Sequence, residues 1–326
     1  MNLKLTLKSI FRKPIIRILR ALLPSLLILV IGLLGFGVWV VYKAAHTPQN
    51  PYLVTPNTFK ILSDRGVKAA EETWNNHDGT KARGWLLRGD EGKPAVILLH
   101  HYSADRSWLL NLGVKLNEAT NFTILWPDLR GHGQNPPVKW TSFGGCETDD
   151  AVAAIEYLRS LKTPEGRPLV GANIGMYGLE LGGYVSLLTA KKDPSVRALV
   201  LDSVPASSES MLYNIVKSRS AFDLGILRPL TNAGASLYLR NCFQDKQSCN
   251  EANQINNRSV MLLAGADAAV YQDSTNALAN CFPKTNTIEH FGNLPRTGFN
   301  LIVANGEQSE EYDRRVIDFF SKTLNQ

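Results

Sequence analysis

An uncharged apolar stretch near the N-terminus constrains this 326-residue chain more than any other feature. Residues 21–42 read ALLPSLLILVIGLLGFGVWVVY, and these 22 residues span about 33 Å as a helix, enough to cross a membrane. Trp39 and Tyr42 stand at one end of the stretch, where membrane spans place aromatic side chains. The stretch is longer than the apolar core of a cleaved signal peptide, and Lys43-Ala44-Ala45 is a poor cleavage site. We therefore expect an uncleaved transmembrane helix at 21–42.

The charges on either side of this stretch predict its orientation. Residues 1–20 form a basic arm with six Lys and Arg side chains and no acid, whereas Lys43 alone follows the stretch. By the positive-inside rule, the arm is cytoplasmic and the C-terminal domain is exoplasmic, in the periplasm or outside the cell. The arm also accounts for the whole formal net charge of +6. The rest of the chain is neutral overall and predicts no nucleic-acid partner.

The remaining sequence predicts a short tether and one α/β domain. Residues 43–62 are rich in proline and read as the tether, and residues 63–326 as the domain. Apolar runs such as AVILL and MLLAG indicate strands buried on both faces, and they alternate with amphipathic segments of helix length. This order predicts a doubly wound, mostly parallel sheet. Strands are expected at 81–87, 95–100, 122–126, 172–177, 198–201, 260–264 and 287–291, and helices at 107–119, 149–161, 182–191, 274–281 and 308–323.

One long segment interrupts this alternation. Residues 203–258, approximately, combine Pro, Gly, Ser and Asn with short helical stretches. In doubly wound sheets, an insertion at the carboxyl ends of the strands covers the crevice in which ligands bind. We therefore expect this segment to form a lid.

Four segments carry a resemblance to a known family. They are PAVILLHH, WPDLRGHGQN, IGMYGLELGG and VRALVLDSVP, in the order in which that family has them. The chain resembles the α/β-hydrolase superfamily, close to its serine-aminopeptidase-like and esterase-like branch, from about residue 67 to residue 324. The resemblance implies the α/β-hydrolase fold. It also implies a nucleophile elbow of the form G-x-S-x-G, a catalytic acid after the seventh strand and a histidine in the last loop.

The residues at these three positions depart from the family. The elbow reads Gly178-Leu179-Glu180-Leu181-Gly182, so that Glu180 replaces the serine. The resemblance places Ala268 at the position of the acid and Phe299 at the position of the histidine. We therefore expect a degenerate triad and a pseudoenzyme that binds a protein partner, a lipid or another small hydrophobic ligand.

Two other functions remain open on the same residues. In an active hydrolase of esters, amides or epoxides, Glu180 would be the nucleophile or base, His290 its partner, and Asp267 or Asp273 the residue that orients the histidine. Alternatively, the protein is an accessory subunit of a membrane complex.

The elbow itself suggests a role for its glutamate. It leads into a helix, whose first N–H groups bind anions. The family's His-Gly oxyanion loop reads His100-His101-Tyr102 here. We predict that Glu180 fills the oxyanion hole formed by His101, Tyr102 and Leu181, and accepts hydrogen bonds from the N–H groups of Leu181 and Tyr102. Adjacent histidines on a strand end point to opposite faces, and no H-E-x-x-H or C-x-x-C spacing occurs, so we expect neither a metal nor a cofactor.

The four cysteines suit an exoplasmic domain, where disulfides persist. Cys242 and Cys249 flank six residues of the lid segment, and we predict that they pair. Cys146 and Cys281 either pair with each other or stay free.

Overall fold

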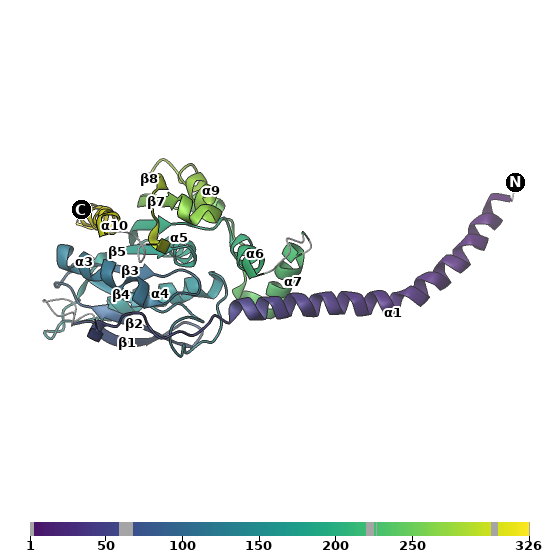
Figure 1. Ribbon diagram of the computed structural model, residues 1–326, viewed down its shortest axis with the longest axis horizontal. Helices are drawn as coiled ribbons and strands as arrows, with labels where there is room; N and C mark the ends of the chain where they lie inside the picture. The colour runs from purple at the N-terminus through teal and green to yellow at the C-terminus, as the bar shows by residue number, and fades with distance from the viewer. Residues whose placement is uncertain (1–2, 59–67, 220–224, 226, 301–305, 326) are drawn as a thin grey trace.

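A computed structural model describes residues 3–58, 68–219, 225, 227–300 and 306–325, with side chains from residue 21 onward (Figure 1). Its centre is an eight-stranded sheet in the order β1-β2-β4-β3-β5-β6-β7-β8. The strands are β1 (Ala70–Asn75), β2 (Lys81–Leu87), β3 (Lys93–Leu99), β4 (Thr123–Pro127), β5 (Val170–Leu179), β6 (Val196–Asp202), β7 (Ser259–Gly265) and β8 (Thr287–Leu294).

Strand β2 runs antiparallel to both β1 and β4, and the other neighbours are parallel. The predicted doubly wound, mostly parallel sheet is therefore confirmed. The sequence analysis did not predict strand β1. Its sequence AEETWN buries only Trp74, so it lacks the apolar alternation by which a strand is found.

Helices cover both faces of the sheet. Their bounds are α3 (Leu110–Thr120), α4 (Gly145–Ser160), α5 (Leu181–Lys192), α6 (Ser208–Arg219), α7 (Leu227–Tyr238), α8 (Ser248–Ala252), α9 (Ala269–Leu278) and α10 (Gly306–Leu324), with 3-10 turns η1 (Arg106–Leu109), η2 (Arg240–Cys242), η3 (Ala266–Ala268) and η4 (Gly298–Asn300). Helices α3 and α10 pack into the apolar core on one face, and α4, α5 and α9 into the core on the other.

Each predicted helix overlaps a helix of the structure, but some of the first and last residues differ. The helix expected at 107–119 starts as η1 and continues as α3, because Asp105 caps the first turn through the N–H of Ser107. The helix expected at 274–281 starts five residues earlier, at Ala269. The lid segment forms α6, α7, η2 and α8. Of these, α6 and α7 lie beside the inner end of the N-terminal helix (Figure 1).

The N-terminal helix α1 (Leu3–Ala45) projects from the domain and contains one candidate membrane span, Ala21–Ala45 (Figure 1). It ends at Ala45 rather than at Tyr42, because its last turn is buried in the domain, where Val41 and Ala44 are at most 1% exposed. The hydroxyl of Tyr102 donates to the carbonyl of Ala44 at 2.6 Å.

Helix α1 also packs directly against α7. A Cβ atom added to Gly37 would lie 2.5 Å from the carbonyl oxygen of Leu230, and one added to Gly234 would lie 2.4 Å from the carbonyl oxygen of Gly37. The backbones approach this closely only because both positions are glycine. The inner end of α1 is thus part of the folded domain.

The segment predicted as a tether behaves differently from a free linker. Residues 43–45 belong to α1, and the chain that follows lies along the domain. Thr47 donates to the carbonyl of Gly131, and the Tyr52 hydroxyl donates to Asp128 at 2.7 Å. Residues 59–62 of the predicted tether lie outside the described residues.

The predicted Cys242–Cys249 disulfide is wrong. The structure instead joins Cys146 to Cys242 and Cys249 to Cys281. Cys242 lies over the start of α4, where its carbonyl oxygen fits only because residue 145 is glycine. Cys249 lies on α8, which packs against α9 and so faces Cys281. Each cysteine of the lid therefore pairs with a neighbour in space rather than in sequence.

Candidate functional site

The elbow between β5 and α5 carries Glu180 at its tip. Glu180 has φ 51° and ψ −105°, a conformation that costs energy for any residue with a side chain and persists only where its surroundings enforce it. Gly182 allows the sharp turn, because a Cβ atom there would lie 2.2 Å from the carbonyl oxygen of Leu99. The backbone of a nucleophile elbow is therefore formed, with glutamate in place of serine.

Glu180 is only 4% exposed, and its carboxylate lies against the residues of the oxyanion loop and of α9. Its Oε2 atom accepts a hydrogen bond from the backbone N–H of Tyr102 at 2.7 Å. Its Oε1 atom accepts one from the hydroxyl of Tyr271 at 2.7 Å. The carboxylate thus accepts the Tyr102 N–H, one of the two to which the sequence analysis assigned it, and the Tyr271 hydroxyl covers its other oxygen.

Burial governs the protonation of this pair. It raises the pKa of Glu180 from its ordinary value, while the donors at Tyr271, Tyr102 and the Leu181 backbone lower it. Burial and the nearby Glu180 carboxylate both raise the pKa of Tyr271 far above its ordinary value. Tyr271 is therefore a protonated donor at neutral pH, and it has no tendency to act as a base.

The sequence analysis did not identify Tyr271. It lies in the first turn of α9, in a stretch that the sequence assigned to a loop. Its ring stacks on that of Phe299 with ring centres 6.3 Å apart, and Phe299 also lies 4.8 Å from the ring of His101. The predicted histidine position therefore contributes to an aromatic cover beside Glu180. The one sequence signal that could have indicated Tyr271 is its position, three residues after Ala268, where the family places its catalytic acid.

The residues of the active-hydrolase hypothesis are not brought together. Asp267 accepts hydrogen bonds from the N–H and hydroxyl of Thr297 and from the side chain of Asn300. His290 is exposed on β8, where its Nε2 atom lies 2.8 Å from Oδ1 of Asn276. Asp273 is exposed on α9. In the described part of the chain, no hydrogen bond links any of these three to Glu180.

In the oxyanion loop, His100 is buried, His101 is half-buried, and both are neutral. Burial lowers the pKa of His100 to about 3 and that of His101 to about 4. The Nδ1 atom of His101 lies 2.8 Å from the carbonyl oxygen of Tyr102, and Nε2 of His100 accepts from the N–H of Leu129. Their hydrogen bonds therefore fix the loop that presents the Tyr102 N–H. Over the described residues, no three His, Cys, Asp or Glu side chains lie together in a way that would hold a metal ion.

A second buried carboxylate, Asp202, ends β6 and was also missed. It accepts hydrogen bonds from the N–H of Gly298 at 2.7 Å and from the hydroxyl of Tyr312 at 2.5 Å. Burial raises its pKa to about 6. Because Gly298 precedes Phe299, Asp202 fixes the backbone from which the aromatic cover extends.

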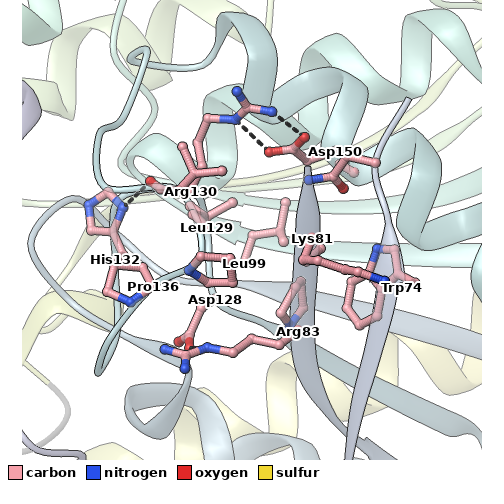
Figure 2. A pocket seen from close by; sticks show the side chains of 16 residues that line it. Trp74, Lys81, Arg83, Leu99, Asp128, Leu129, Arg130, His132, Pro136 and Asp150 are labelled. Atoms are coloured by element: carbon pink, nitrogen blue, oxygen red, sulfur yellow. Dashed lines mark hydrogen bonds and ion pairs between the residues drawn. The ribbon is translucent and has the colours of Figure 1, made fainter. Parts of the chain in front are cut away.

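Two hollows lie near these residues. A shallow one is lined by Asp267, Ala268, Tyr271 and Phe299, and opens on the outer side of the cover. A small pocket beside β2 and β4 has Arg83 directed toward Asp128 and Arg130 toward Asp150 (Figure 2). Arg83 and Arg130 are each paired with a carboxylate, and these pairs stabilise this edge of the sheet. Lys81 and His132 also line the pocket.

Solved structures similar to this chain are hydrolases. No family model matches the sequence, and no curated protein matches it. An esterase of Pyrococcus furiosus aligns over 85% of this chain and 99% of its own, with 19% identity and a TM-score of 0.64. The enol-lactonase of Burkholderia xenovorans aligns over 77% and 100%, with 16% identity and a TM-score of 0.52. An acylaminoacyl peptidase of Pyrococcus horikoshii aligns over 78% and 41%, with 13% identity and a TM-score of 0.57.

These similarities are structural, and they agree with the strand order and with the elbow between β5 and α5. The chain therefore has the α/β-hydrolase fold, with a lid segment and an apolar N-terminal helix long enough to span a membrane.

Proposed function

We propose that this protein is a membrane-anchored, exoplasmic α/β-hydrolase-fold protein that acts by binding rather than by hydrolysis. One observation carries the proposal: the Glu180 carboxylate accepts the N–H of Tyr102 and is covered by the hydroxyl of Tyr271. An oxyanion hole stabilises a transition state only if its N–H groups are free to bind the oxygen of the substrate. In this structure the Glu180 carboxylate already accepts the hydrogen bond from the Tyr102 N–H.

Nucleophilic catalysis by Glu180 meets two obstacles. A carboxylate that forms an ester with the substrate needs a base to activate water in the second step. The polar side chain against Glu180 is Tyr271, which is protonated, and the carboxylate is buried beneath it. His290 and Asp267, which the active-hydrolase hypothesis requires, bond to Asn276 and Thr297 instead. No observation favours hydrolysis over binding.

The membrane anchor and the exoplasmic location have separate support. The candidate span in α1 has a mean hydropathy of 2.5, and basic residues precede it. The two disulfides suit an oxidising compartment. An accessory role in a membrane complex remains compatible with this arrangement, but no contact among the described residues specifies such a partner.

Turnover by the full-length protein in mild detergent tests the proposal. The panel contains short and medium acyl esters, amides and an epoxide, and the variants are Glu180→Gln and, as a control, Glu289→Gln on β8, a half-buried side chain that lies 3.6 Å from Lys322. We expect the wild type and both variants to show the same background rate. Turnover by the wild type that disappears in Glu180→Gln and persists in Glu289→Gln would overturn the binding proposal and make Glu180 a catalytic carboxylate.

A further inference from the structure

A groove of about 220 Å³ lies between the inner end of α1 and the lid helices, away from Glu180. Phe36, Trp39 and Val40 of α1 form one wall, and Val216 of α6 and Leu227 of α7 contribute to the other. Figure 1 shows α6 and α7 beside this end of α1. The groove is therefore built by the membrane helix and the lid together.

The position of the groove along α1 sets its depth in a membrane. Phe36 and Lys43 are seven residues apart, or about 10 Å along the helix axis. Trp39 is 56% exposed, at the level where tryptophan marks the boundary between hydrocarbon and headgroups. The apolar end at Phe36 therefore lies among acyl chains, and the end at Lys43 lies among headgroups.

Two cations stand at the headgroup end. Arg219 donates hydrogen bonds to the carbonyl of Lys43 at 3.2 Å and to the hydroxyl of Tyr102 at 2.9 Å, which holds its guanidinium beside Lys43. Both residues line the groove, and no Asp or Glu does. Among the described residues, no ion pair joins either cation to a carboxylate. An apolar wall that ends in two cations complements the acyl chain and charged headgroup of an anionic lipid.

We propose that this groove binds one anionic phospholipid from the outer leaflet, with its headgroup phosphate at Lys43 and Arg219 and an acyl chain along Phe36 and Val40. The inference rests on the membrane anchor of the proposed function but not on the inactivity of Glu180. Bound lipid would join α6 and α7 to α1 and so hold the lid against the membrane.

Native mass spectrometry of the full-length protein in mild detergent tests this site, with phosphatidylglycerol and phosphatidylcholine of the same acyl chains as probes. We expect one phosphatidylglycerol to bind, and to bind more tightly than phosphatidylcholine. The double variant Lys43→Gln/Arg219→Gln should lose about 20- to 30-fold in affinity, because each cation near the headgroups contributes roughly fivefold.

The matched control is Lys217→Gln/Arg228→Gln. It removes two cations from α6 and α7 that lie over the ring of Tyr213 and do not line the groove. It should bind phosphatidylglycerol within twofold of wild type. Because Arg219 also bonds to Tyr102, the single variant Lys43→Gln, at an exposed side chain, repeats the test without disturbing the domain, and should lose about fivefold.

Equal affinity for the two lipids, or equal loss in the control and the groove variants, would overturn the lipid site. The anchor is tested separately by alkaline carbonate extraction of membranes that contain the same variants. Protein that resists extraction but shows no lipid preference refutes the groove alone, whereas extraction of the wild type refutes the anchor on which the inference rests.

Discussion

The hydroxyl of Tyr271 donates a hydrogen bond to the carboxylate of Glu180 at 2.7 Å, although 91 positions separate the two residues in the sequence. This contact joins the helix after β7 to the elbow after β5. In a catalytic member of the fold, the same region would hold a substrate over the nucleophile. In this protein the side chains of Glu180 and Tyr271 fill that region and form a hydrogen bond with each other.

Removal of the Glu180 carboxylate should destabilise the protein. In Glu180→Ala, the N–H of Tyr102 and the hydroxyl of Tyr271 lose their acceptor in a buried site, which costs about 1–3 kcal/mol of unfolding free energy. Urea denaturation of the full-length protein at pH 7 measures it. A more stable variant would instead indicate a strained catalytic residue, whose loss relieves the fold.

Tyr271→Phe should lower the unfolding free energy by about 1 kcal/mol, because one oxygen of Glu180 loses its donor while the aromatic stacking on Phe299 remains. In a double-mutant cycle with Glu180→Ala, the two losses should fail to add by about 0.5–1 kcal/mol. Strict additivity would show that the two side chains do not interact in solution.

Stability should depend on pH through Asp202. Its pKa rises from 3.8 to about 6 on folding, so its contribution to stability is complete below pH 3.8 and disappears as the pH rises through 6. Relative to Asp202→Asn, the wild type should therefore lose about 2 kcal/mol between pH 4 and pH 7.5. Denaturation of both proteins at the two pH values measures this, and a difference that stays constant with pH would refute it.

The inner end of α1 should be needed for full stability of the domain. A chain that starts at residue 46 loses the buried side chains of Val41 and Ala44 and the acceptor of the Tyr102 hydroxyl, and should unfold about 3 kcal/mol more easily than one that starts at residue 36. Denaturation of both in the same detergent compares them. Equal stability would mean that α1 contacts the domain without supporting it.

Loss of the Cys146–Cys242 disulfide should also be costly, because it closes 96 residues of sequence. The double variant Cys146→Ser/Cys242→Ser should lose about 2–5 kcal/mol of unfolding free energy. Peptide mapping under non-reducing conditions checks the pairing itself. A peptide that links Cys242 to Cys249 would contradict the structure.

The sheet and most of the elbow could be predicted from sequence because their signals are local. The run AVILL marks a strand buried on both faces, and the glycines around Glu180 mark a turn that only they permit. The position of Glu180 against Tyr102 also followed, since both lie at the ends of adjacent parallel strands.

What depends on distant packing could not be predicted. Tyr271 lies in the first turn of α9, which begins at Ala269, five residues before the helix that the sequence pattern predicts. The cysteines of the lid pair according to which helices lie beneath them, and a gap of six residues between Cys242 and Cys249 carries no information on that. Strand β1 pairs with β2 through its backbone, which leaves little trace in its side chains.

Tyr102 donates two hydrogen bonds, one from its side-chain hydroxyl and one from its backbone N–H. Its hydroxyl donates to the last turn of α1 at Ala44, and its N–H donates to Glu180. A single residue therefore connects α1 to the tip of the elbow. Any displacement of α1 along its own axis would reach the buried carboxylate through Tyr102, without first deforming the sheet.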